Sequence, residues 1–263
     1  MLGAIIGDIV GSRFEFNNHK SKDFEFMTQQ CEITDDSIMT LAIAEAFMAC
    51  QGDFTELGQV VISGMQRLGR EYPHTGYGNR FQLWLSMENP MPYNSYGNGA
   101  AMRVSACAYV AISLEEACLL SEKVTEVTHN HPEGIKGAEA TTVAIWLARQ
   151  GYGIPEIRDY IHEHYYTMDF TLDGIRPTYT FNETSQETVP QAIMAFLESK
   201  NFEDAIRNAI SIGGDSDTLA AITGSIAQAY YGIPEDIREQ ALTYLDETLL
   251  KILLGFEGMY QEG

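Results

Sequence analysis

Two acidic turns hold the residues best suited to chemistry. Each turn combines two carboxylates with a threonine hydroxyl directly before an apolar helical pattern: Thr34, Asp35 and Asp36 in "ITDDSIMT", and Asp215, Asp217 and Thr218 in "GGDSDTLAA". One aspartate is enough to cap a helix, so simple capping leaves the second carboxylate of each turn unexplained. If the turns meet, four carboxylates would repel one another without a cation. Oxygen ligands of this kind suit Mg²⁺, Mn²⁺ or Ca²⁺ rather than zinc, and a metal bridging the two turns is the sharper alternative to two helix caps.

A further carboxylate candidate lies near the N-terminus, in "GAIIGDIVGSRFEF". Glu15 is flanked by Phe14 and Phe16, and burial between aromatic rings would raise its pKa toward a range useful for acid–base work. An ordinary exposed glutamate between two core aromatic residues is the alternative. Asp8 precedes it in the same glycine-punctuated segment.

A third segment, "SYGNGAAMRVS", places Gly97, Asn98 and Gly99 before an apolar helical pattern. Backbone N–H groups at a glycine-bearing helix start can hold a phosphate without a lysine, although a cap and a tight turn would need the same residues. It is not a dinucleotide-binding fingerprint, because no strand precedes it and Met102 occupies the third glycine position.

The segment "THNHPEG" contains two histidines, His129 and His131. An H-x-H pair can bind zinc, but no cysteine or third histidine lies nearby with suitable spacing. We therefore expect a single ligand-binding or loop-structuring histidine rather than a zinc site.

The elements that must position these residues are predicted to be helices. Apolar residues recur at helical spacing along most of the chain, and capping residues predict helix starts at Asp53, Ser113 and Asn201. The only strand-prone stretch, "YTFNET" at 179–184, fits a loop at least as well. It lies within 167–188, the longest irregular piece, which would border a site or form a surface connection. The sequence predicts an all-α protein of about ten helices in one domain, 1–263.

Composition limits the partners of such a protein. Sixteen Lys and Arg residues against 37 Asp and Glu give a net charge of −21, which repels phosphate backbones and anionic lipids. Nonspecific nucleic-acid binding and membrane binding are therefore not expected. A phosphate-bearing small ligand would need backbone N–H groups or bound cations in its pocket to offset the negative charge. Four cysteines without a C-x-x-C pair, no cationic leader and no apolar run of roughly 20 residues favour a cytoplasmic protein.

Five segments in order make a family resemblance specific: "GAIIGDIVGSRFE", "ITDDSIMTLAIAEA", "YGNGAAMRVS", "VTHNHPEGIKGAEATTVAIWLA" and "SIGGDSDTLAAITGSIAQAYYG". Together they resemble the ADP-ribosylglycohydrolase family, which includes the dinitrogenase reductase-activating glycohydrolases. The resemblance implies a compact orthogonal all-α fold and a centre of two Mg²⁺ or Mn²⁺ ions. It also implies binding of ADP-ribose and cleavage at C1″ of its distal ribose.

Carried onto this sequence, the resemblance implies roles for thirteen residues. The expected metal ligands are Thr34, Asp35, Asp36, Asp215, Asp217 and Thr218; the expected catalytic residues are Glu15, Asp36 and Asp215; and the expected substrate-binding residues are Asp8, Gly97, Asn98, Gly99, Met102 and His129. The implied function is release of ADP-ribose from a modified protein or a small-molecule conjugate. A non-catalytic ADP-ribose or nucleotide-binding module is the alternative, and a structural helical protein whose acids are only caps is a third. The acceptor remains open between arginine, serine, another residue, a nucleobase and a small molecule, as does the oligomeric state.

Overall fold

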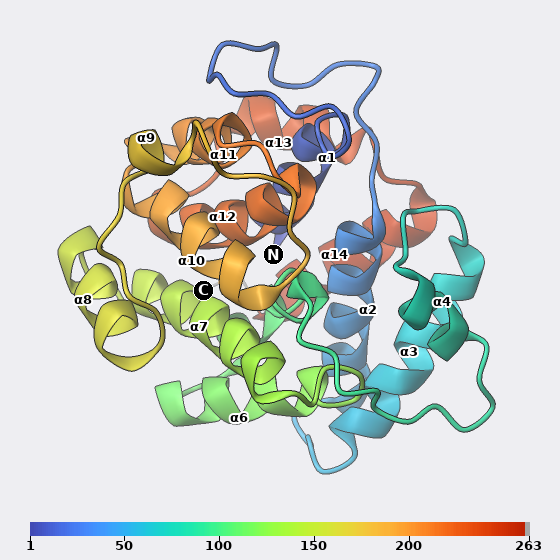
Figure 1. Cartoon of the computed structure of the whole chain (residues 1–263). Helices are drawn as coiled ribbons and strands as arrows, with labels where there is room; N and C mark the ends of the chain where they lie inside the picture. The colour runs from blue at the N-terminus through green and yellow to red at the C-terminus, as the bar shows by residue number, and fades with distance from the viewer. Residues whose placement is uncertain (261–263) are drawn as a thin grey trace.

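The computed structural model describes residues 1–260, which form fourteen α-helices and one short 3₁₀ helix (Figure 1). Within these residues the β-structure is limited to an isolated antiparallel bridge between Gly97 and Thr184. The helices are α1 (Leu2–Ser12), α2 (Asp35–Cys50), α3 (Leu57–Glu71), α4 (Asn79–Leu85), η1 (Asn98–Ala100), α5 (Ser105–Val110), α6 (Leu114–Thr125), α7 (Pro132–Arg149), α8 (Ile154–His164), α9 (Leu172–Ile175), α10 (Ser185–Leu197), α11 (Phe202–Ser211), α12 (Ser216–Tyr231), α13 (Glu235–Leu242) and α14 (Glu247–Tyr260).

The all-α prediction is confirmed, and the estimate of about ten helices is too low for the part of the chain that is described. The additional helices are short ones such as α4, α5 and α9, which span too few turns to give a clear 3.6-residue pattern. The predicted domain, 1–263, extends three residues beyond the described ones.

Two of the three predicted helix starts are confirmed. The side chains of Ser113 and Asn201 accept hydrogen bonds from backbone N–H groups three residues later and cap α6 and α11. The start at Asp53 is wrong, because its carboxylate instead accepts hydrogen bonds from the N–H and hydroxyl of Thr55 in a local turn. The helix α3 begins only at Leu57.

The helix α12 lies at the centre of the fold and packs against α1, α7, α10 and α11. Its residues from Ser216 to Ala227 are all buried, which explains why this segment is apolar around its whole circumference. The helix α2 packs beside α3 and α14, and its buried residues also extend around the helix. Both helices that follow the acidic turns are therefore core elements rather than surface helices.

Glycines of α1 bring that helix unusually close to α12. A Cβ added at Gly7 would lie 1.9 Å from the carbonyl oxygen of Ala220, and one added at Gly11 would lie 2.5 Å from Cα of Asp217. No side chain fits at either position without moving one of the backbones. This close contact places the end of α1, and Glu15 beyond it, next to the start of α12.

No helix within residues 1–260 combines the length and the apolar character that crossing a lipid bilayer requires.

Candidate metal and substrate site

The structure brings the two acidic turns together at the N-termini of α2 and α12. The Thr218 hydroxyl donates a hydrogen bond of 3.2 Å to Oδ2 of Asp36, which joins residues 182 positions apart. Thr34 is the N-cap of α2 and Asp215 the N-cap of α12. The positive ends of two helix dipoles therefore face the same group of carboxylates, which favours negative charge there.

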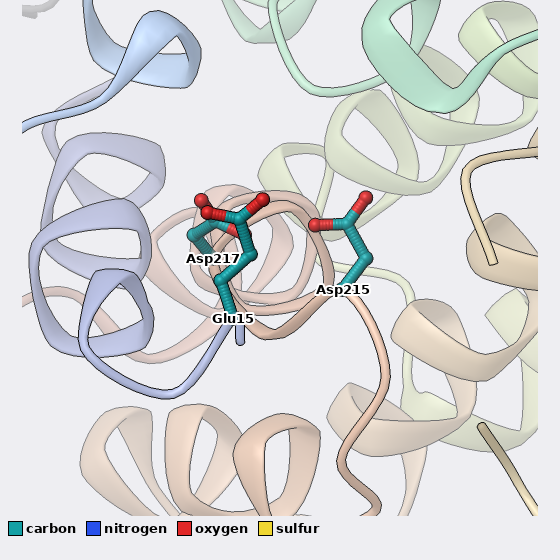
Figure 2. Close-up of side chains that lie close together, drawn as sticks. All are labelled: Glu15, Asp215 and Asp217. Carbon is teal, nitrogen blue, oxygen red and sulfur yellow. The ribbon is translucent and has the colours of Figure 1, made fainter. Parts of the chain in front are cut away.

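Glu15 completes the cluster from a third part of the chain. Carboxylate oxygens of Glu15, Asp215 and Asp217 all lie within 4.8 Å of one another, and Figure 2 shows the three side chains converging from the loop after α1 and the start of α12. Asp215 also accepts a hydrogen bond of 2.7 Å from the Asn98 side-chain amide.

Burial and mutual repulsion raise the carboxyl pKa values throughout this cluster. Desolvation, followed by the charges of neighbouring carboxylates such as Asp215, raises the pKa of Glu15 to about 7 and that of Asp35 to about 8. The same two causes raise the pKa values of Asp36 and Asp217 well above the ordinary aspartate value. Without a compensating cation, the group cannot carry its full negative charge at neutral pH.

The donor set fits a divalent oxygen-seeking cation. Oδ1 of Asp36 is buried and has no hydrogen-bond partner among residues 1–260, although a buried carboxylate oxygen is normally paired. It belongs to the same cluster as Asp35, Asp215 and Asp217, whose oxygens are hard ligands suited to Mg²⁺ or Mn²⁺. The unpaired acceptor and the crowded carboxylates are both explained if a cation binds there.

Asp8 lies beneath this cluster rather than in the expected substrate-binding position. Its carboxylate is fully buried and accepts four hydrogen bonds, from the backbone N–H and hydroxyl groups of Thr34 and Ser37. These bonds fix the first turn of α2, so Asp8 holds the acidic turn in place. Thr34 donates its hydroxyl proton to Asp8 and accepts from the Asp36 N–H, which leaves its Oγ1 only one lone pair for a metal.

The carboxylates form one side of a cavity of about 510 Å³. Every residue with an expected site role lines this cavity except Asp8 and Thr34. The expected residues that line it are Glu15, Asp35, Asp36, Gly97, Asn98, Gly99, Met102, His129, Asp215, Asp217 and Thr218. Glu183 and Thr184 also line it, so the irregular stretch 167–188 borders the site. Such a volume accommodates a nucleotide-sized ligand.

The glycine loop offers fewer free backbone donors than expected. The N–H of Asn98 donates to the carbonyl of Glu183 at 2.8 Å, and that of Gly97 donates to the Ser95 hydroxyl. The Asn98 amide also binds Asp215 and Thr188, so this side chain orients a carboxylate of the cluster. Within residues 1–260, only the Gly99 N–H of this trio lacks a protein acceptor.

The two histidines have different roles. His131 is the N-cap of α7, where its Nδ1 accepts from the Glu133 N–H, so it structures the loop. His129 is 5% exposed and lines the cavity. Its backbone N–H and Nδ1 are both bound within the protein.

Sequence reasoning missed the basic and aromatic lining of the cavity. Arg103 is 1% exposed, and burial lowers its pKa to about 10. The guanidinium of Arg80 lies 4.8 Å from the ring centre of Tyr93, and both residues line the cavity. Arg103 follows "GNGAAM" directly. An arginine within an apolar segment of so acidic a chain is a sequence signal that could have indicated a basic residue in the site.

An exposed aromatic pair adjoins the same side of the cavity as Glu15. The ring of Phe16 is 86% exposed and stacks on Phe181 with the ring centres 6.1 Å apart. Their neighbours Glu15 and Glu183 line the cavity. The two rings therefore stand beside the carboxylate end of the cavity.

Comparisons with known proteins identify the family of this chain. The family model for ADP-ribosylglycohydrolase matches residues 1–260. A human protein, ADP-ribosylhydrolase ARH3 from Homo sapiens, is 25% identical over 95% of this chain and 90% of its own length. ADP-ribosylarginine hydrolase Tri1 from Pseudomonas putida is 26% identical over 89% of this chain and 70% of its own length.

A solved structure titled "ADP-ribosylglycohydrolase-related protein complex" shares the fold, with a TM-score of 0.73 over 98% of this chain and 95% of that chain. Its identity to this sequence is 22%, so this likeness concerns the fold alone. The match over residues 1–260 carries the assignment, and the chain belongs to the ADP-ribosylglycohydrolase family.

Proposed function

We propose that this protein is a metal-dependent hydrolase that cleaves the glycosidic bond at C1″ of ADP-ribose and so reverses ADP-ribosylation. The observation that carries the proposal is the meeting of the two acidic turns with Glu15 at one end of a nucleotide-sized cavity. The names of ARH3 and Tri1, which this chain matches over 90% and 70% of their own lengths, support the same class of reaction.

Asp35, Asp36, Asp215, Asp217, Thr218 and Thr34 would hold two Mg²⁺ or Mn²⁺ ions. Bound there, the ions would orient and polarise the distal ribose. Asn98 keeps Asp215 in position through its amide, and Asp8 keeps the first turn of α2 in position through four hydrogen bonds. The side chains around the cluster are thus fixed before any ligand enters.

Glu15 is the proposed acid–base residue. It is half-buried, it lies within 4.8 Å of Asp215 and Asp217, and its pKa of about 7 suits proton transfer near neutral pH. Its carboxylate would take a proton from the attacking water as the bond between C1″ and the acceptor breaks through an oxocarbenium-like state, and it would pass that proton to the departing acceptor. Asp36 and Asp215 would assist as carboxylates of the metal site.

The acceptor would leave on the side of Glu15, past the stacked rings of Phe16 and Phe181. This side carries the Glu15 and Glu183 carboxylates together with an exposed ring face. A guanidinium group can bind both features, whereas a serine side chain carries no charge for them. Arginine-linked ADP-ribose is therefore the first linkage to test.

The test incubates the protein with ADP-ribosylated arginine and serine peptides, with Mg²⁺, with Mn²⁺ and with a chelator. Release of free ADP-ribose only with metal, and its loss in Asp215→Asn, is the expected result. Tight binding of ADP-ribose without release from either linkage would instead support the alternative, a non-catalytic binding module. Absence of both ADP-ribose binding and metal dependence would contradict both functions.

A further inference from the structure

A hydrogen-bonded chain connects a buried arginine to the cavity histidine. Nη2 of Arg103 donates to Oγ1 of Thr128 at 2.6 Å, and Oγ1 of Thr128 lies 2.7 Å from Nδ1 of His129. Arg103 and Thr128 are 1% and 0% exposed, so water does not compete for these bonds. Arg103 and His129 both line the cavity.

The direction of this chain follows from which groups can donate. A guanidinium has donors only, so Thr128 must accept from Arg103 and has its own hydroxyl proton left to donate. His129 Nδ1 is its only neighbouring acceptor within hydrogen-bond distance among the described residues. If Nδ1 carried a proton instead, the buried hydroxyl would be left without an acceptor, which is unfavourable because water does not reach it.

The charge of the ring agrees with this direction. Burial, followed by the positive charges of Arg103 and Arg80, lowers the pKa of His129 well below its usual value. The ring is therefore neutral at pH 7, and its single proton lies on Nε2.

Nε2 faces the place where a ligand would lie. A Cβ added at Gly97 or Gly99 would be 3.6 Å or 3.5 Å from this nitrogen, so both glycines leave the space in front of it open. Nε2 has no protein partner within residues 1–260. Since the Gly97 and Asn98 backbone N–H groups are bound within the protein, the loop itself offers little to an anion at this point.

We propose that Arg103 is a positioning residue which, through Thr128, fixes His129 as a neutral Nε2–H donor facing the Gly97–Gly99 loop. The identity of the ligand that this donor meets, a diphosphate oxygen of ADP-ribose, rests on the proposed function. The tautomer itself does not. Arg103 thus acts on the ligand indirectly, and also supplies a buried positive charge to the cavity of a strongly acidic protein.

The tautomer can be read directly in the full chain without any ligand. In protein labelled with ¹⁵N-histidine, two-bond ¹H–¹⁵N correlation spectra distinguish a protonated from an unprotonated ring nitrogen, and His129→Gln identifies the signal. At pH 7.5 we expect Nε2 protonated and Nδ1 unprotonated. A protonated Nδ1 or an imidazolium in the wild-type protein would overturn the proposal.

Variants then test the connection. Thr128→Val removes the hydroxyl and should release the tautomer preference, whereas Thr128→Ser should retain it. Thr125→Val is the matched control, because its buried hydroxyl lies in the same stretch and makes no hydrogen bond to any of residues 1–260. An unchanged His129 spectrum in folded Thr128→Val, or the same change in Thr125→Val, would overturn the proposed role of Thr128.

Binding of ADP-ribose, measured by isothermal titration calorimetry with Mg²⁺, separates the two proposals. We expect Thr128→Val to weaken binding about tenfold and Thr128→Ser and Thr125→Val to leave it within about twofold. Equal affinity of wild type and Thr128→Val, despite a changed tautomer, would remove the donor role from His129. The predicted tautomer in a protein that does not bind ADP-ribose would keep the positioning role and contradict the proposed function.

Discussion

At the scale of single residues, Glu15 is the side chain on which the proposed chemistry depends most. Glu15→Gln keeps the size of the side chain and removes its capacity to exchange a proton near pH 7. We expect kcat to fall by about 10²–10⁴ with little change in the affinity for ADP-ribose. Glu32→Gln, an exposed change, is the control. Full activity of Glu15→Gln would assign proton transfer to another group and leave the metal site standing.

Asp8 is a residue-scale case in which the structure changes the expected role. All four of its hydrogen bonds come from donors, so in Asp8→Asn the new amide NH₂ would face donors of Thr34 or Ser37. We expect Mg²⁺ affinity to drop about 10–100-fold, as when a supporting group of a metal site is lost. Titration calorimetry with Mg²⁺ alone measures this. Unchanged Mg²⁺ affinity with weakened ADP-ribose binding would instead restore the direct substrate-binding role.

At the scale of elements, the contact between α1 and α12 decides whether the site forms. A methyl group at Gly7 cannot fit 1.9 Å from the Ala220 carbonyl oxygen, so Gly7→Ala should destabilise the protein by about 3 kcal/mol or more. Gly58→Ala on α3 is the matched helical control, since the nearest atom there is 3.7 Å away; it should be neutral or slightly stabilising. Urea denaturation followed by circular dichroism measures both. Equal stability of the two variants would contradict the close packing.

At the scale of the whole molecule, the carboxylate cluster links metal, pH and stability. Because burial raises the folded-state pKa values of Glu15 and Asp35 to about 7 and 8, the folded metal-free protein binds more protons than the unfolded chain. The contribution of these groups to the free energy of unfolding therefore falls as pH rises from their ordinary pKa values near 4 through pH 8. A divalent cation should remove this loss.

We therefore expect the Tm increase caused by Mg²⁺ to be larger at pH 8.0 than at pH 6.5. At a concentration 100 times its Kd, Mg²⁺ should stabilise by about 2.7 kcal/mol, or about 5–10 °C for a chain of this size. Differential scanning calorimetry with Mg²⁺ and with chelator measures the change in Tm at each pH. The effect of pH on groups remote from the site is the same with and without Mg²⁺, so it cancels in this comparison. Asp215→Asn should reduce the difference between the two pH values. An Mg²⁺ effect on Tm that is equal at both pH values would contradict binding of the cation by these carboxylates.

Local sequence patterns were enough to predict the features that depend on near neighbours along the chain. Helical spacing, the caps of Ser113 and Asn201 and the lack of alternating strands established an all-α chain, because helices are set by residues three and four positions apart. The doubled aspartates indicated a cation site, because one carboxylate suffices for a cap. The ordered segments indicated the family, which the match over residues 1–260 bears out.

Which of these residues meet, and what each one contacts, depends on how the helices pack. The bond from Thr218 to Asp36 spans 182 positions and exists because the C-terminal half of α1 packs against the N-terminal ends of both α2 and α12, an outcome of side-chain shape that no local pattern records. The same packing buries Asp8, pairs the Gly97 and Asn98 N–H groups within the protein and buries Arg103 against Thr128. The type of each residue can be read from a short stretch of sequence, whereas its burial and its hydrogen-bond partners depend on segments far apart in the chain.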